Sequence, residues 1–181
     1  MIKLAEKFEE DNLGVVAICG NDPSIQPQDS FENMQSLAKQ FRLSFPYLHD
    51  EGQSVMKQLG ATGLDIHAVW GNNDGDRFKL TQIAAQFPNI KLYGEYIGDD
   101  DSLLHLDGVR FGVTHYHFYA KTMVKTGWYD VVCFGHSHKV HRQKFGNALL
   151  INPGEVGGIM GLATYAVYDT QLQGSEIIEI G

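Results

Sequence analysis

The first half of the chain alternates short apolar runs with amphipathic segments, and this alternation constrains the fold more than any other feature. The apolar runs GVVAIC, FPYLHD and IHAVW have the length and composition of strands. The amphipathic segments between and after them have helical periodicity and cover residues 29–41, 53–60 and 77–87. Since strands that alternate with helices form parallel sheets with helices on their faces, the sequence predicts an α/β fold.

The second half of the chain consists instead of strands joined by tight turns. Asp107-Gly108 and Gly146-Asn147 each separate two strand-like runs, and both pairs are typical of hairpin turns. Two further runs, TYAVYDT and SEIIEI, end the chain as strands. We therefore expect two mixed β-sheets packed face to face and flanked by helices, in a single domain that covers residues 1–181.

Charge and cysteine content narrow the class of protein. The 14 basic and 22 acidic residues give a formal net charge of -8, which argues against nucleic acid as a generic polyanionic partner but permits a small phosphorylated substrate. Cys19 and Cys133 lie far apart within apolar runs, so we expect two buried, reduced thiols in a cytoplasmic protein. No apolar stretch reaches the roughly 18 residues of a membrane span, so no membrane partner is expected.

The segment VVCFGHSHKVHRQ places His136 and His138 directly after an apolar strand, 130–134. The carboxyl ends of such strands are where ligands bind in open α/β sheets. Two imidazoles at positions i and i+2 can converge on one point, as a metal ion requires and an apolar core does not.

Four loops share this position after a strand. They read GNND at 71–74, THYH at 114–117, GHSH at 135–138 and INPG at 151–154. The side chains that they supply are Asn72, His115, His117, His136 and His138. Imidazole nitrogens and amide oxygens suit manganese, iron, zinc, cobalt or nickel, and the lack of thiolates argues against a structural zinc site.

These four motifs, in this order and spacing, resemble the calcineurin-like metallophosphoesterase superfamily, in its small bacterial and archaeal phosphodiesterase branch, over about residues 63–181. The resemblance implies hydrolysis of a small phosphate ester at a site with two metal ions, with manganese favoured. It assigns Asn72, His115 and His136 to one ion and His138 to the other. Asp74 and His117 would orient ligands or assist the leaving group. Small phosphoesterases of this type often form homodimers.

The superfamily's first two metal motifs, Asp-x-His and Gly-Asp, are missing from residues 1–62. This segment resembles instead the thioredoxin-like, peroxiredoxin-type redoxins, from their first core helix through the strand with Pro-Tyr-Leu. It lacks their redox cysteine motif, since Cys19 does not match its position. The sequence therefore suggests a chimera in which a redoxin-like αβαβα segment completes the phosphoesterase sheet.

The ligands missing from this segment have two candidate replacements. Asp50 ends the strand FPYLHD, where the resemblance places a carboxylate that bridges the two metals. Its alternative role is that of a solvated carboxylate that caps the following helix. Asp22 follows the first strand, and its alternative role is that of a turn residue before Pro23. Two functions follow: a phosphodiesterase with an incomplete dinuclear site and reduced activity, or a catalytically silent scaffold that binds one metal weakly or none.

Overall fold

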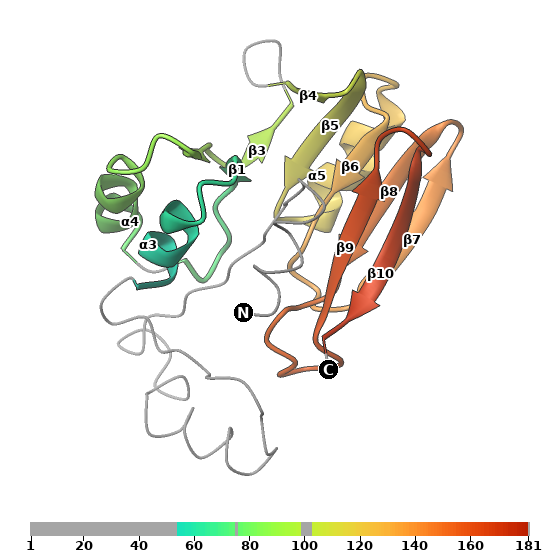
Figure 1. Ribbon diagram of the computed structural model, residues 1–181. Coiled ribbons are helices and arrows are strands. Elements are labelled where there is room, and N and C mark those ends of the chain that lie inside the picture. Colours follow the sequence, from blue (N-terminus) through green and yellow to red (C-terminus); the bar gives the residue numbers. More distant parts are fainter. Residues whose placement is uncertain (1–53, 75, 99–102, 181) are drawn as a thin grey trace. The chain divides into compact units, whose positions relative to one another are not determined.

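The computed structural model describes residues 54–74, 76–98 and 103–180 (Figure 1). These residues form two compact units, one built from 54–67 and 73–92 and the other from 68–72 and 93–180. Residues 1–53, which hold most of the segment that resembles redoxins in sequence, lie outside the described residues, and with them Asp22, Asp50 and Cys19.

The first unit pairs two short strands with two helices. Its elements are α3 (Ser54–Ala61), β1 (Ile66–Ala68), α4 (Arg77–Ala84) and β2 (Ile90–Leu92), and β1 pairs with β2. Helix α4 begins where sequence periodicity predicts, because the side chain of Asp76 accepts a hydrogen bond from the Lys79 amide and caps its first turn. A small core of Ile66, Ala84 and Ile90 joins the strands to the helices.

Gly60, where the helical periodicity of residues 53–60 ends, does not stop the helix. Helix α3 runs through it to Ala61, and a Cβ on Gly60 would overlap the ring of Phe87. The turn that follows the helix is made by Gly63, whose φ of +71° is a left-handed conformation that favours glycine.

The second unit is built on a six-stranded sheet. Its strands are β3 (Tyr96–Ile97), β4 (Leu104–Leu106), β5 (Val109–Thr114), β6 (Val131–Cys133), β7 (Val140–Phe145) and β8 (Ala148–Pro153). The order is β3-β5-β6-β8-β7, with β4 also paired to β5. Strands β5, β6 and β8 are parallel, whereas β3, β4 and β7 run antiparallel to their neighbours. Both predicted hairpins are confirmed, at Asp107-Gly108 and at Gly146-Asn147.

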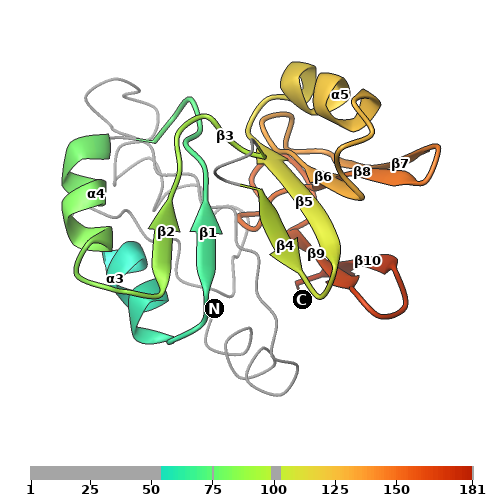
Figure 2. The same ribbon diagram turned by 90° about the horizontal axis from the view of Figure 1, so that it is seen from above.

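Each face of this sheet carries its own cover, as Figure 2 shows. Helix α5 (His117–Lys125) packs through Ala120 and Val124 against Val132 and Leu150 on one face. The hairpin of β9 (Thr164–Asp169) and β10 (Gly174–Glu179) packs on the other face, around Phe111. The predicted fold class, an α/β arrangement of two packed sheets flanked by helices, is confirmed.

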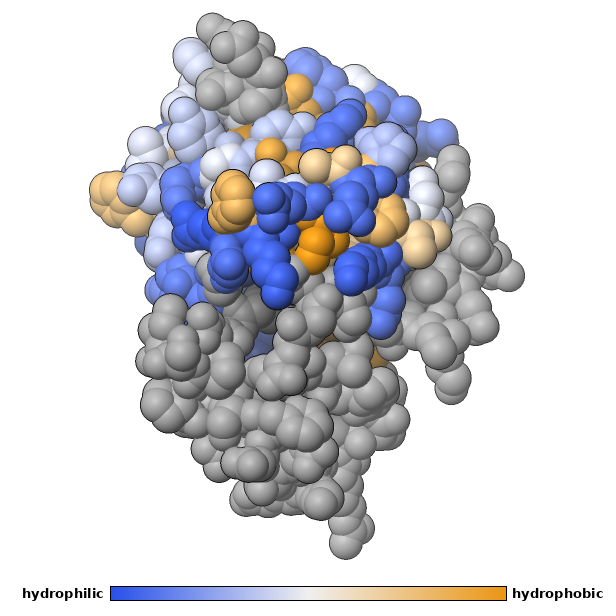
Figure 3. All heavy atoms as spheres, turned by 90° about the vertical axis from the view of Figure 1, so that its left-hand side faces the viewer, coloured by the Kyte–Doolittle hydropathy of each residue, from blue (hydrophilic) through white to orange (hydrophobic). Residues whose placement is uncertain are grey.

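On the side seen in Figure 3, the described residues are mostly hydrophilic, with hydrophobic ones scattered among them. No helix within the described ranges is long and apolar enough to cross a membrane. Burial raises the pKa of the Cys133 thiol on β6 to about 12, which disfavours its reactive thiolate form.

Candidate metal centre

Three loops of the second unit begin where its parallel strands end. His115 follows β5, the GHSH segment follows β6, and Glu155 follows β8. Because β5, β6 and β8 are neighbours and run in the same direction, these loops share one edge of the sheet. Asn72, which follows β1 in the sequence, belongs to the same unit.

Three predicted ligands converge at this edge. The Oδ1 atom of Asn72 lies 2.6 Å from Nε2 of His115 and 2.9 Å from Nδ1 of His136. The two imidazole nitrogens are 3.1 Å apart. The three donor atoms therefore form a small triangle made by residues that are far apart in the sequence.

The triangle has the dimensions of one face of a metal coordination shell. Ligand atoms about 2.1 Å from an ion and at right angles to one another lie roughly 3.0 Å apart. The amide oxygen of Asn72 only accepts hydrogen bonds, so both imidazoles can donate to it. The two N–H groups are then crowded together, because their nitrogens are 3.1 Å apart. A cation above the plane of the triangle, about 2.1 Å from each of the three atoms, would replace this crowding with three favourable contacts. The donor set therefore fits one divalent metal ion.

The surroundings keep His115 in the state that a metal needs. Burial, followed by the nearby imidazoles of His136 and His138, lowers the pKa of His115, while Glu95 opposes this shift. A lowered pKa means that the imidazole is neutral at pH 7 and its lone pair is available. The Tyr116 ring packs against both His115 and His136, with ring centroids 4.9 and 5.0 Å away, and so forms one wall of the site.

The GHSH loop has an unusual backbone. His136 and His138 have φ angles of +68° and +56°, which non-glycine residues rarely adopt. Such conformations cost about 1–3 kcal/mol each and persist only where surrounding contacts enforce them.

Asn152, in the INPG motif, supplies part of this enforcement. It is fully buried, and its amide group donates to the Gly135 carbonyl at 2.9 Å and to the Ser137 hydroxyl at 3.1 Å. Its oxygen accepts from the Gly154 amide at 2.9 Å. Sequence reasoning noted the motif but gave this side chain no role.

His138 is held separately from the triangle. Its Nδ1 atom lies 2.8 Å from Oε2 of Glu155, a side chain that is 8% exposed. Glu155 is the second residue that sequence reasoning missed, although it directly follows the INPG motif.

His117, predicted to take part in catalysis, contacts other residues. It opens helix α5 and stacks on Phe134 with ring centroids 4.8 Å apart, beside His141. The Nε2 atoms of His117 and His141 are buried and have no hydrogen-bond partner. Burial, followed by Lys121 and His141, lowers the pKa of His117.

The remaining predicted residues, Asp74 and Asp50, lie in other parts of the chain. Asp74 is half-buried in the loop before α4 and belongs to the first unit, whereas the three donors belong to the second. Asp50 lies outside the described residues. Within the described part of the chain, no three His, Cys, Asp or Glu side chains form a group that could hold a metal ion. The triangle consists of two imidazoles and one amide, none of which carries a negative charge.

Comparison with known proteins supports the same chemistry. The model of the calcineurin-like phosphoesterase superfamily domain matches residues 2–173, and so begins well before residue 63. Phosphodiesterase MJ0936 of Methanocaldococcus jannaschii is 29% identical over 172 residues, which cover 93% of this chain and 84% of the relative.

Two solved structures share the fold. A novel archaeal phosphodiesterase superposes with a TM-score of 0.69 at 25% identity, over 99% of this chain and 90% of its own. TT1561 of Thermus thermophilus has a TM-score of 0.50 at 12% identity, over 70% of this chain and 77% of its own, and its likeness concerns the fold alone. Since the family model spans almost the whole sequence, the chain belongs to the calcineurin-like phosphoesterase superfamily, whose members use divalent metal ions.

Proposed function

We propose that this protein is a metal-dependent phosphodiesterase that acts on a small phosphate ester, with manganese as the favoured ion and nickel, zinc, iron or cobalt as alternatives. The observation that carries the proposal is the convergence of Asn72, His115 and His136 on one point at the edge of the sheet. The relative MJ0936, which is named a phosphodiesterase, supports the choice of reaction.

The protein's own residues bind and orient the reacting groups. Asn72, His115 and His136 would hold one ion on one side, which leaves its other side open to the phosphate and to water. When bound, such an ion stabilises negative charge on the phosphoryl oxygens and makes water a better nucleophile. Asp74 and His117 would then assist the leaving group or orient a ligand.

A second ion would depend on His138 and on Asp50 as the bridging carboxylate. Because the superfamily's Asp-x-His and Gly-Asp motifs are missing from the sequence of residues 1–62, we expect weak second-site occupancy and reduced activity. A redoxin-like origin of residues 1–62 would explain the absence of the usual ligands, and it stays a prediction.

Metal content and activity test the proposal together. The protein is loaded with manganese, desalted and analysed for ions per chain, and then assayed on bis-p-nitrophenyl phosphate and on p-nitrophenyl phosphate. We expect one tightly bound ion, a second weak one, and diester hydrolysis that is lost in H136A but kept in H105A, a histidine exposed on β4. Absence of bound metal and of diester hydrolysis would leave the silent scaffold as the function.

Partners and location follow the same proposal. We place the protein in the cytoplasm because its two cysteines, far apart in apolar runs, are expected to stay reduced. With a formal net charge of -8, we expect a small phosphate ester as substrate and no nucleic acid partner. We also expect a homodimer, which light scattering on the purified protein would detect as twice the mass of one chain.

A further inference from the structure

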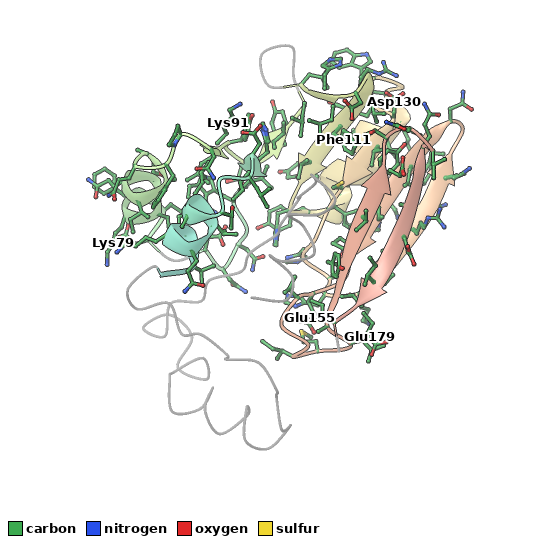
Figure 4. The ribbon with its side chains drawn as sticks, viewed as in Figure 1. Lys79, Lys91, Phe111, Asp130, Glu155 and Glu179 are labelled. Atoms are coloured by element: carbon green, nitrogen blue, oxygen red, sulfur yellow. The ribbon has the colours of Figure 1, made fainter. Side chains whose placement is uncertain are left out.

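Glu155 makes two hydrogen bonds from a nearly buried position at the end of β8 (Figure 4). Its Oε2 atom contacts Nδ1 of His138 at 2.8 Å, and its Oε1 atom accepts a hydrogen bond from the Met160 amide. One side chain therefore links the GHSH loop to the segment between β8 and β9.

The contact with Glu155 fixes which nitrogen of His138 carries the hydrogen. An ionised carboxylate only accepts hydrogen bonds, so Nδ1 of His138 is the donor. The hydrogen on Nδ1 leaves Nε2 of a neutral imidazole with a free lone pair, which is the form that binds a metal ion. Carboxylates that bind the far nitrogen of a metal-binding histidine commonly raise metal affinity in this way.

The backbone around Glu155 is held firmly enough for this task. The Glu155 carbonyl accepts a hydrogen bond from the Thr164 amide at 2.8 Å, and the Thr164 hydroxyl donates to the Pro153 carbonyl at 2.6 Å. Gly154 has a φ of +92°, and a Cβ at this position would overlap the Thr164 hydroxyl. The carboxylate thus projects from a fixed strand end rather than from a loose loop.

His138, in contrast, has an intrinsically unfavourable backbone. Its left-handed φ of +56° costs about 1–3 kcal/mol. Contacts that stabilise the native loop therefore have to offset this conformational cost. The contact with Glu155 is made from another strand end, 17 residues further along the chain.

We propose that Glu155 is a positioning residue that holds His138 as its Nδ1–H tautomer and directs Nε2 toward the ion that His138 binds. The proposal rests on the proposed function for the identity of that ion. It adds a residue that acts through His138 and does not itself touch the substrate.

Histidine nitrogen shifts in the metal-free protein test the tautomer directly. In ¹⁵N-labelled wild type at pH 8, above the ordinary histidine pKa of about 6.5, we expect His138 almost wholly as the Nδ1–H form. In E155A the balance should move toward Nε2–H, which isolated imidazoles favour. In E155Q a smaller shift is expected, because the amide has one acceptor oxygen for which His138 and Met160 compete.

Manganese affinity provides the second measurement. Chelator competition should show a 10–100-fold loss for the ion that His138 binds in E155A, while the ion at Asn72, His115 and His136 keeps its affinity. E176Q, an exposed change on β10, serves as the matched control and should leave both readouts unchanged. Thermal unfolding of each variant checks that it is folded.

The outcomes separate this proposal from the proposed function. If wild type binds no manganese, the proposed function fails, and the tautomer measurement still decides the role of Glu155. An unchanged His138 tautomer in both E155A and E155Q, or a wild-type His138 that is already Nε2–H, would overturn the proposal.

Discussion

The buried side-chain amide of Asn152 connects the GHSH loop to the end of strand β8. Its three hydrogen bonds tie Gly135 and Ser137 to Gly154, and no part of the side chain is exposed. In N152A, the Gly154 amide loses this partner at a partly buried position, and the Gly135 carbonyl keeps only the Ser137 amide as a donor. We expect a loss of about 1–3 kcal/mol in the free energy of unfolding, measured by urea denaturation. A change below about 0.5 kcal/mol would contradict this role.

The pair of Arg110 and Asp130 is expected to make stability depend on pH. The pair lies at the end of the sheet opposite Glu155 (Figure 4). The Arg110 guanidinium donates two hydrogen bonds to the Asp130 carboxylate, at 2.8 and 3.0 Å. The side-chain hydrogen bonds from Arg110 lower the pKa of Asp130. The pair therefore stabilises the protein above the ordinary carboxyl pKa of about 3.9, and this stabilisation is lost as the pH falls through the lowered value.

The change D130N tests the sign of this effect. Because both side chains are 39% exposed, solvent screening limits the expected loss to about 0.5–1 kcal/mol at pH 7. The difference between wild type and D130N in urea denaturation should shrink as the pH is lowered from about 5 to about 3. A difference that stays constant or grows over that range would show that the ion pair is not its cause.

At the scale of elements, the packing of α3 depends on Gly60. Alanine has the higher helix propensity by about 1 kcal/mol, so G60A would stabilise an isolated helix. In the protein the added Cβ would overlap the Phe87 ring, and overpacking of this kind costs about 1–3 kcal/mol. We expect G60A to lower the thermal unfolding midpoint of the protein. G94A, where a Cβ meets nothing within 4 Å, should leave it unchanged.

Local sequence signals predicted the elements of the second unit well. Asp107-Gly108 and Gly146-Asn147 determine their hairpins through backbone conformations that their own residues favour, with φ of +49° at Asp107 and +59° at Gly146. The apolar run before GHSH became β6, whose residues Val131 and Val132 are fully buried. The role of Gly60 could not be read in the same way, because it depends on Phe87, a residue distant in the sequence.

For the molecule as a whole, the same difference between local sequence signals and contacts of distant residues separates the predicted ligands from the residues that support them. The convergence of His115 and His136 could be predicted because they follow β5 and β6, parallel neighbouring strands that end at one edge. Asn72 could be predicted from its motif alone, since it follows β1, which pairs with β2 in a separate sheet. Glu155 and Asn152 could not, because their contacts depend on the left-handed backbone of the GHSH loop. Sequence periodicity contains no signal for that conformation, since only the fold enforces it.

The centre joins loops that are distant in the sequence, so an ion bound there should stabilise the whole second unit. A ligand at 100 times its dissociation constant adds about 2.7 kcal/mol to the free energy of unfolding. Both tryptophans, Trp70 and Trp128, belong to this unit, so their fluorescence reports its unfolding. We expect manganese to raise the unfolding midpoint of wild type and of H105A, and to leave H115A unchanged. An equal rise in H115A would show that the ion binds elsewhere, because that variant lacks one corner of the triangle while H105A keeps all three.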